Sequence, residues 1–263
     1  MNIFYLDNDV KTCAQLHVDK HVVKMISEYI QLLSTAHRLL DVDIVTMFPV
    51  PGKKTKPYRL LPGESLDIKY ILIEEDYKHD EDEDEDTSSE FVPTYEPKAY
   101  IKNQQAAALT HANHPSAQWV RQSKANYDWL WSLTVALNEE YKFRYSGRDH
   151  KLFVDYQHFL KNSPRNISSA QFTEPTPAMP DKYKVLNDSV LSYKKYYVGS
   201  KYRFAKWKNR QVPAWFYDLI ASVWNDDEQD ARLSFFSETK NLSKSSISEY
   251  ILNGNYKTGT SLS

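Results

Sequence analysis

Residues 17–38 read HVDKHVVKMISEYIQLLSTAHR, a stretch that lacks glycine and proline and whose apolar residues recur at helical spacing. We expect one long helix from about residue 10 to residue 40, capped at its start by Asp9 or Thr12. At about 100° per residue, its polar side chains share a strip roughly 80° wide, and apolar side chains cover most of the remaining circumference. The strip contains His17, His21, Lys24, Glu28, Gln31 and Thr35.

A helix this apolar is mostly buried, so its polar strip has two interpretations. It is either the solvated edge of the helix, with Lys24 and Glu28 as an ordinary i,i+4 ion pair, or the floor of a cleft. The mixed composition of the strip favours the cleft, because a solvated edge is usually rich in lysine and glutamate. There, His17 and His21 could bind a metal with a third ligand, or histidine and Glu28 could transfer protons. A desolvated lysine, Lys24 or Lys20, could act as a nucleophile.

The composition indicates a mainly α, single-domain helical bundle. The chain has 263 residues, enough for one good-sized core, but only 6 glycines, which argues against Rossmann, P-loop and barrel folds. The single cysteine, Cys13, excludes a disulfide framework and a cysteine-based zinc site. No apolar run reaches the length of a membrane span, and the N-terminus does not resemble a signal peptide. We therefore expect a cytoplasmic protein with no membrane partner.

The net charge of −2 conceals an uneven distribution. Residues 74–90 hold 11 of the 35 acidic residues and one of the 33 basic residues, so the rest of the chain carries 24 acids and 32 bases. The acidic run is either a solvated loop or a competitor for the basic surface of the body.

Glycine, proline and polar residues that interrupt the apolar pattern predict the boundaries of the remaining elements. We expect a short strand over residues 1–6, a long and partly disordered insertion over 41–96 with a possible strand at 68–73, and helical periodicity over 97–108 and from Ser116. A second strong helix begins at Ser123 or Asn126 and ends near Tyr145, where Gly147 stops it. A loop over 160–182 precedes a helix at about 189–197. The bundle covers 1–236, and 237–263 is a peripheral tail.

Two further segments carry candidate site residues. His111 and His114 precede a helix in which aromatic and basic residues alternate, and residues 182–210 hold nine bases and one acid among Tyr, Phe and Trp. Because bases of nucleic acids offer π-faces and phosphates offer charge, this mixture predicts DNA as the partner. The candidate DNA-binding residues are Arg121, Lys124, Lys194, Lys195, Tyr196, Tyr197, Lys201, Arg203, Lys206, Trp207, Lys208 and Arg210.

Two patterns carry a resemblance to known proteins. They are YLDxDxxxCAxxHxDKHVVKMxxExxQLLxTAHR and HPxxxWVRxSxxNYxWLxxLxxALxxEYxxRY. Together they resemble a group of phage-encoded proteins, and the order of elements is similar to that of the pyrimidine-dimer DNA glycosylases. That resemblance implies an all-α repair enzyme with an extended N-terminal segment, a catalytic glutamate on a long helix, and a lysine- and aromatic-rich segment on the DNA. Glu28, the turn at 143–145 and residues 193–207 stand in the corresponding places.

The chain departs from that family at its start. The family forms an imine through the amine of a threonine exposed by removal of the initiator methionine, whereas residue 2 here is Asn2. The resemblance therefore implies that the amine of Met1 or Asn2 serves, that a side-chain amine such as Lys24 replaces it, or that the chemistry differs.

These observations lead to a hypothesis of a phage-type, DNA-acting enzyme that excises or modifies a base without a metal or other cofactor. Its expected catalytic residues are Glu28, Lys24, His17, His21 and His114. One alternative is a non-catalytic factor that binds DNA or a host protein. A further alternative is a metal-dependent nuclease or hydrolase that uses His17, His21 and Glu28.

Overall fold

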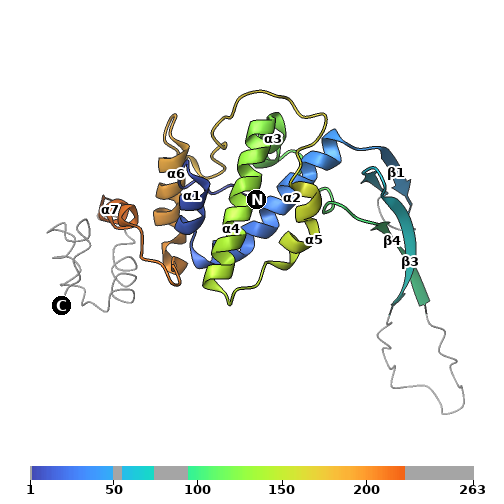
Figure 1. Cartoon of the computed structure of the whole chain (residues 1–263), viewed down its shortest axis with the longest axis horizontal. Coiled ribbons are helices and arrows are strands. Elements are labelled where there is room, and N and C mark those ends of the chain that lie inside the picture. The colour runs from blue at the N-terminus through green and yellow to red at the C-terminus, as the bar shows by residue number, and fades with distance from the viewer. Residues whose placement is uncertain (1, 50–54, 74–93, 223–263) are drawn as a thin grey trace, which may run out of the picture. The chain divides into compact units, whose positions relative to one another are not determined.

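The computed structural model describes residues 2–49, 55–73 and 94–222 (Figure 1). Backbone contacts divide the chain into two compact units. One contains the residues up to Leu40 and those from Ala106 onward, and the other contains Asp41–Gln105. The first unit is helical and the second consists of β-hairpins, so helices dominate and small sheets accompany them.

The N-terminal segment is extended and buried but is not a strand, contrary to the expectation for residues 1–6. Its backbone N–H groups bond to side chains instead of to another strand. Phe4 N–H donates to the hydroxyl of Tyr29 at 3.2 Å, and Leu6 N–H donates to Cys13 Sγ at 3.4 Å. These bonds satisfy the polar backbone of a segment whose side chains lie in the core.

The expected helix over residues 10–40 is two helices, α1 Val10–Leu16 and α2 Asp19–Leu40. Asp9 caps α1 as predicted, since its side chain accepts from the N–H of Thr12. The chain turns at His17, whose ψ is 135°. The guanidinium of Arg144 occupies the turn and donates to the carbonyls of Gln15 and His17, both at 2.9 Å.

Helices α3 Pro115–Gln122, α4 Lys124–Arg144 and α5 Lys151–Leu160 pack against α2 (Figure 1). The predicted second helix is confirmed as α4. Its N-cap is Ser123, which accepts from the N–H of Asn126, and Gly147 follows its end with a φ of 74°. Helix α5 is amphipathic and was not predicted.

The chain after α5 is irregular up to the 3₁₀ turn η1 Asp181–Tyr183, which confirms the expected loop. Helix α6 Ser189–Tyr196 follows, as predicted, and continues into a π-helix, η2 Tyr197–Lys201. A 3₁₀ turn, η3 Tyr202–Phe204, and helix α7 Ala214–Ser222 complete the described chain. None of the helices in the described ranges is long and apolar enough to cross a membrane.

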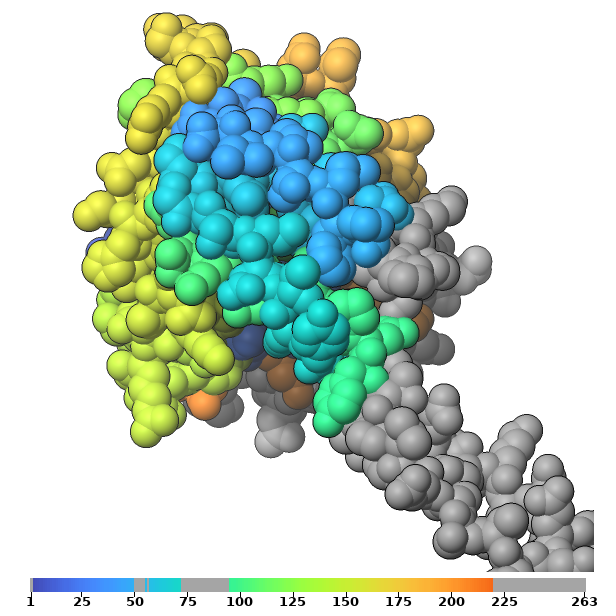
Figure 2. Space-filling model, turned by 90° about the vertical axis from the view of Figure 1, so that its right-hand side faces the viewer, coloured from blue at the N-terminus to red at the C-terminus, as the bar shows by residue number. Residues whose placement is uncertain are grey.

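The second unit holds two antiparallel hairpins, β1 Ile44–Phe48 with β2 Lys56–Leu60 and β3 Ser65–Ile73 with β4 Thr94–Lys102. The strand expected at 68–73 is part of β3, but the helical periodicity read over 97–108 was wrong. Along β4, apolar residues alternate with charged or polar ones, and this alternation is typical of a strand. Figure 2 shows residues of β1–β3 in blue to cyan. The acidic run 74–90 and the tail 237–263 lie outside the described residues.

Candidate functional site

A carboxylate on α2, Glu28, lies between two nitrogen groups. Its Oε1 is 3.1 Å from Lys24 Nζ, and its Oε2 accepts from the backbone N–H of Asn2 at 3.1 Å. The Glu28 side chain is 14 % exposed and the Lys24 side chain is 70 % exposed. We call Asn2, Lys24, Glu28 and the nearby His114 the Glu28 site.

Asn2 is held in place by its own side chain. Its Nδ2 donates to the carbonyl of Ala178 at 2.9 Å, and its Oδ1 accepts from the hydroxyl of Tyr193 at 2.7 Å. Tyr193 lies on α6 and is fully buried. Segments that are far apart in sequence thus fix the backbone nitrogen of residue 2 against Glu28, which is the kind of support that a precise site needs.

His114 is the N-cap of α3, and its Nδ1 accepts from the N–H of Ser116 at 3.2 Å. Partial burial lowers the pKa of His114, and the nearby carboxylate of Glu28 opposes that shift. Two further members of the strip, Gln31 and Thr35, lie beyond Glu28 on α2. Thr35 is buried and donates to the carbonyl of Thr110 at 3.0 Å, so it anchors the loop that leads to His114.

His17 is not in the site, contrary to expectation. It lies in the turn between α1 and α2, is completely buried, and has both ring nitrogens bonded. Nδ1 lies 2.7 Å from the carbonyl of Cys13, to which it must donate, so Nε2 accepts from the hydroxyl of Tyr29 at 3.1 Å. Burial lowers the pKa of His17 to about 4, so this histidine is neutral at pH 7. It holds the turn and is not accessible to a substrate.

His21 is also a structural residue. Its Nδ1 lies 2.7 Å from the hydroxyl of Tyr197, and its ring stacks on Phe4 with centroids 4.2 Å apart. Only 7 % of the residue is exposed, and burial lowers its pKa to about 2. Within the described residues, no group of three or more His, Cys, Asp or Glu could hold a metal ion. His17, His21 and Glu28 therefore do not form the ligand set of the metal-dependent alternative.

The candidate DNA-binding residues divide into surface and core. Tyr197 is fully buried and Trp207 is 6 % exposed, with its indole N–H donating to the carbonyl of Leu16, so neither can stack on a base. Arg210 is held by both oxygens of the buried Glu140, at 3.0 and 2.8 Å.

Arg121 donates to the carbonyl of Ala112, and Lys124 pairs with Asp128 one turn further along α4. The other candidates lie at the surface, and several lysines rest on aromatic rings. Lys208 lies over Tyr145 and Lys194 over Trp215, with Nζ 5.3 and 5.5 Å from the ring centroids. The residues that remain as a basic surface are Lys194, Lys195, Tyr196, Lys201, Arg203, Lys206 and Lys208. Lys20 on α2 also lies over an aromatic ring, that of Phe204, at 5.0 Å.

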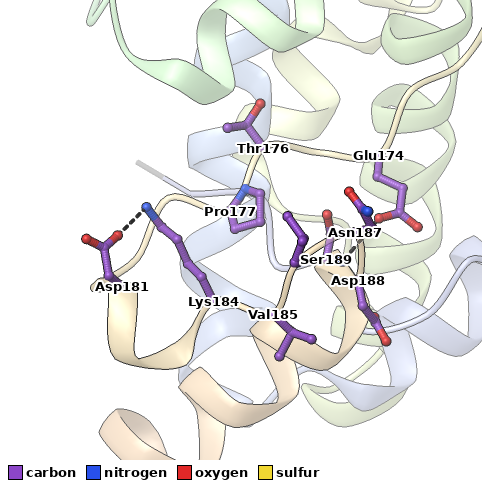
Figure 3. Close-up of a pocket in the computed structure, with 10 residues that line it drawn as sticks. Glu174, Thr176, Pro177, Asp181, Lys184, Val185, Asn187, Asp188 and Ser189 are labelled. Atoms are coloured by element: carbon purple, nitrogen blue, oxygen red, sulfur yellow. Dashed lines mark hydrogen bonds and ion pairs between the residues drawn. The ribbon is translucent and has the colours of Figure 1, made fainter.

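A cavity of about 660 Å³ opens beside η1 and the start of α6 (Figure 3). Its carboxylates already have partners. Glu174 accepts from Ser189 N–H, Asp188 caps α6, and Asp181 pairs with Lys184 at 2.8 Å. This acidic rim is unsuited to phosphate, so we do not assign the cavity to DNA.

In the sequence, Asn2 stands out only as a departure from a family pattern, and neither Tyr29 nor Tyr193 carries a signal of its role. Each acts through a contact between residues 25 or more positions apart, which no local pattern reveals. No protein-family model, curated protein or solved structure matches this chain.

Proposed function

We infer that the protein is a DNA-acting enzyme that removes a base through a covalent intermediate, as a DNA glycosylase with lyase activity does. The observation that carries this proposal is Glu28, a largely buried carboxylate within 3.1 Å of both Lys24 Nζ and the backbone nitrogen of Asn2. A carboxylate beside an amine can accept the proton that the amine releases as it attacks, and can stabilise the cationic sugar that forms as the base leaves.

The proposed reaction first displaces the base and then forms an imine. The lone pair of the amine forms a bond to C1′ of the deoxyribose, the bond from C1′ to the base breaks, and the base departs with the electron pair and takes up a proton. Glu28 accepts the proton from the amine. Opening of the sugar ring then produces an imine between the amine and C1′, which hydride can reduce to a stable amine.

The candidates for the nucleophile are the side-chain amine of Lys24 and the amine at the start of the chain, on Met1 or on Asn2. Lys24 is close to Glu28, but its 70 % exposed side chain lacks the desolvation that favours a reactive lysine. The nitrogen of Asn2 is an amine only in a chain that begins at this residue, and its position is fixed by Ala178 and Tyr193. Of the three expected catalytic histidines, only His114 is not deeply buried, and we assign it proton transfer or substrate positioning.

Borohydride trapping tests the proposal. The full chain is incubated with UV-irradiated duplex and with duplex that contains an abasic site, borohydride is added, and the adduct is mapped by peptide mass spectrometry. We expect an adduct on the first residue or on Lys24, and loss of the adduct in Glu28→Gln. The control is Glu139→Gln, because Glu139 also pairs with a lysine of its own helix, Lys142, at 3.1 Å, although at i,i+3 spacing.

The trapping result also separates the alternatives. Salt-sensitive DNA binding with no adduct on either duplex contradicts base excision by this route and supports the non-catalytic DNA-binding factor. An adduct that survives Glu28→Gln contradicts the role of Glu28.

A further inference from the structure

Two tyrosines, Tyr183 of η1 and Tyr196 of α6, form an aromatic pair at the surface of the helical unit. Their ring centroids lie 5.3 Å apart at an interplanar angle of 49°, and both residues are partly exposed. A lysine ammonium lies over each ring, Lys182 over Tyr183 at 5.0 Å and Lys201 over Tyr196 at 4.7 Å. We call Tyr183 and Tyr196 the tyrosine platform.

The π-helix η2 creates the Lys201 contact. Residues five apart on an α-helix point in directions about 140° apart, so Lys201 could not reach the ring of Tyr196 if α6 simply continued. The wider turn of η2 Tyr197–Lys201 brings residues at this spacing to one side. Such π-turns occur often at functional sites.

A close approach at Gly199 sets the position of the other ring. A Cβ at this residue would lie 2.8 Å from Cζ and 2.8 Å from the hydroxyl oxygen of Tyr183. Both distances are shorter than the normal contact distance of a Cβ atom. Ser200 Oγ donates to the same hydroxyl at 3.0 Å. Tyr183 therefore rests on the backbone of the π-helix, and only glycine at 199 allows it.

The platform and the Glu28 site are linked through the N-terminal segment. The ring of Phe4 is nearly parallel to that of Tyr196, at 11° and 6.3 Å between centroids. One turn earlier on α6, Tyr193 bonds to Asn2. The N-terminal segment thus contacts α6 through Phe4, and it contacts Glu28 through Asn2.

We propose that the tyrosine platform binds an unpaired nucleobase by stacking, while Lys182 and Lys201 move from the ring faces to the flanking phosphates. This rests on the proposed function in that DNA is the ligand. Aromatic rings beside exposed ammonium groups are the combination that holds single-stranded nucleic acid, because each base has a flat face and each phosphate a negative charge. A base removed from the duplex stack could be held there.

Binding of two oligonucleotides to the full chain tests this inference. One is a thymidine oligonucleotide of about six nucleotides, and the other has the same phosphates but only abasic residues. We expect the wild type to bind the thymidine oligonucleotide about tenfold more tightly, as fluorescence anisotropy at fixed salt would show. Equal affinities of the wild type for the two oligonucleotides would overturn the platform.

Substitutions at and beside the platform test whether the preference for the thymidine oligonucleotide arises there. Tyr196→Leu and Gly199→Ala should lose most of the tenfold preference and retain the affinity for the abasic oligonucleotide. Gly199→Ala displaces only the outer part of the Tyr183 side chain, so the fold survives even where Tyr196→Leu proves unstable in thermal melts. The control is Tyr100→Leu, because Lys69 lies over Tyr100 at 5.7 Å in the other unit. An unchanged preference in Gly199→Ala contradicts the inference.

The oligonucleotide-binding test and the borohydride-trapping test can succeed or fail separately. A base preference without a trapped adduct leaves the platform as a binding site and contradicts base excision. A trapped adduct without a base preference contradicts the platform alone.

Discussion

The two halves of the polar strip at the start of the chain differ in what surrounds them. His17 and His21 are buried, and His17 has both ring nitrogens bonded inside the protein. Lys24 and Glu28, one and two turns beyond His21, are partly open to solvent and lie beside the backbone nitrogen of Asn2. Residues of similar polarity, placed at the same helical spacing, thus serve as core hydrogen-bond partners in one half and as a candidate reactive group in the other.

For His17 the difference arises from a residue outside the strip, whereas His21 remains on α2 and is covered by Phe4 and Tyr197. Arg144 enters the turn between α1 and α2 and pairs there with Asp19 at 2.8 Å and with Glu140 at 2.7 Å. By turning the chain at His17, it separates this histidine from the face of α2 that carries Glu28. The comparison therefore teaches that a polar strip predicted from helical spacing holds only as long as the helix does.

The largest expected effect is that of removing this arginine. Its side chain is fully buried and donates to two carbonyls and two carboxylates, so Arg144→Ala leaves buried acceptors without their partner. We expect the free energy of unfolding to fall by about 4 kcal/mol, measured by urea denaturation. Lys142→Ala, on the same helix but with an exposed ion pair to Glu139, should change it by less than about 0.5 kcal/mol. A loss below about 1 kcal/mol for Arg144→Ala would show that the turn forms without it.

The second prediction concerns the pH dependence of the buried half. Burial lowers the pKa of His17 to about 4 and that of His21 to about 2, whereas both have a value near 6.5 in the unfolded chain. The unfolded state therefore binds protons that the folded state does not. Their contribution to stability is complete above pH 6.5 and is lost as the pH falls towards 4, by up to about 1.4 kcal/mol per pH unit for each histidine.

Replacement of one histidine separates this contribution from that of the carboxylates. Between pH 6 and 4.5, His17→Gln should make the slope of unfolding free energy against pH shallower than in the wild type by about 1 kcal/mol per unit. The control is His158→Gln, because His158 is exposed on α5. Identical slopes for the wild type and His17→Gln would mean that His17 is not buried in its neutral form.

Where the sequence predicted elements correctly, the signals were local. Helix α4 begins at a serine cap and ends before a glycine with positive φ, and both features follow from residues within one turn. The turn at His17 has no such signal, since residues 10–40 contain neither glycine nor proline and the cause is Arg144, 127 positions away. Likewise, what fixes β4 as a strand is its pairing with β3, with Ile68 opposite Ala99, which no local pattern shows.

The same distinction applies to the candidate site. The helical spacing identified Lys24 and Glu28 as neighbours, and they are an ion pair. It could not identify Asn2 and Tyr193, because their contact joins residues 191 positions apart. The basic and aromatic composition of residues 182–210 also grouped Tyr197 with Tyr196, although Tyr197 lies in the core and Tyr196 is partly exposed.

The third prediction tests the support of Asn2. Tyr193→Phe removes the hydroxyl that donates to Asn2 Oδ1, so the free energy of unfolding should fall by about 1 kcal/mol in urea denaturation. Tyr5→Phe is the control. Its hydroxyl donates to Asn8, which is exposed, so water replaces the lost partner and the effect should be a few tenths of a kcal/mol. If Tyr193→Phe is no more destabilising than Tyr5→Phe, the contact does not hold the N-terminal segment.

The smallest effect is expected in the open half of the strip. Lys24 and Glu28 form an i,i+4 pair with one highly exposed partner, so the coupling energy in a double-mutant cycle of Lys24→Ala and Glu28→Gln should be about 0.3–0.5 kcal/mol and should fall as salt is added. The pair Lys142 and Glu139 provides a second cycle with the same distance of 3.1 Å and greater exposure of the carboxylate. If the coupling energy is similarly small in both cycles, the stability of the fold does not require a largely buried glutamate at position 28. A catalytic role for Glu28 predicts this result. A coupling above about 1 kcal/mol for Lys24 and Glu28 would instead make the pair structural, and both halves of the strip would then serve the fold.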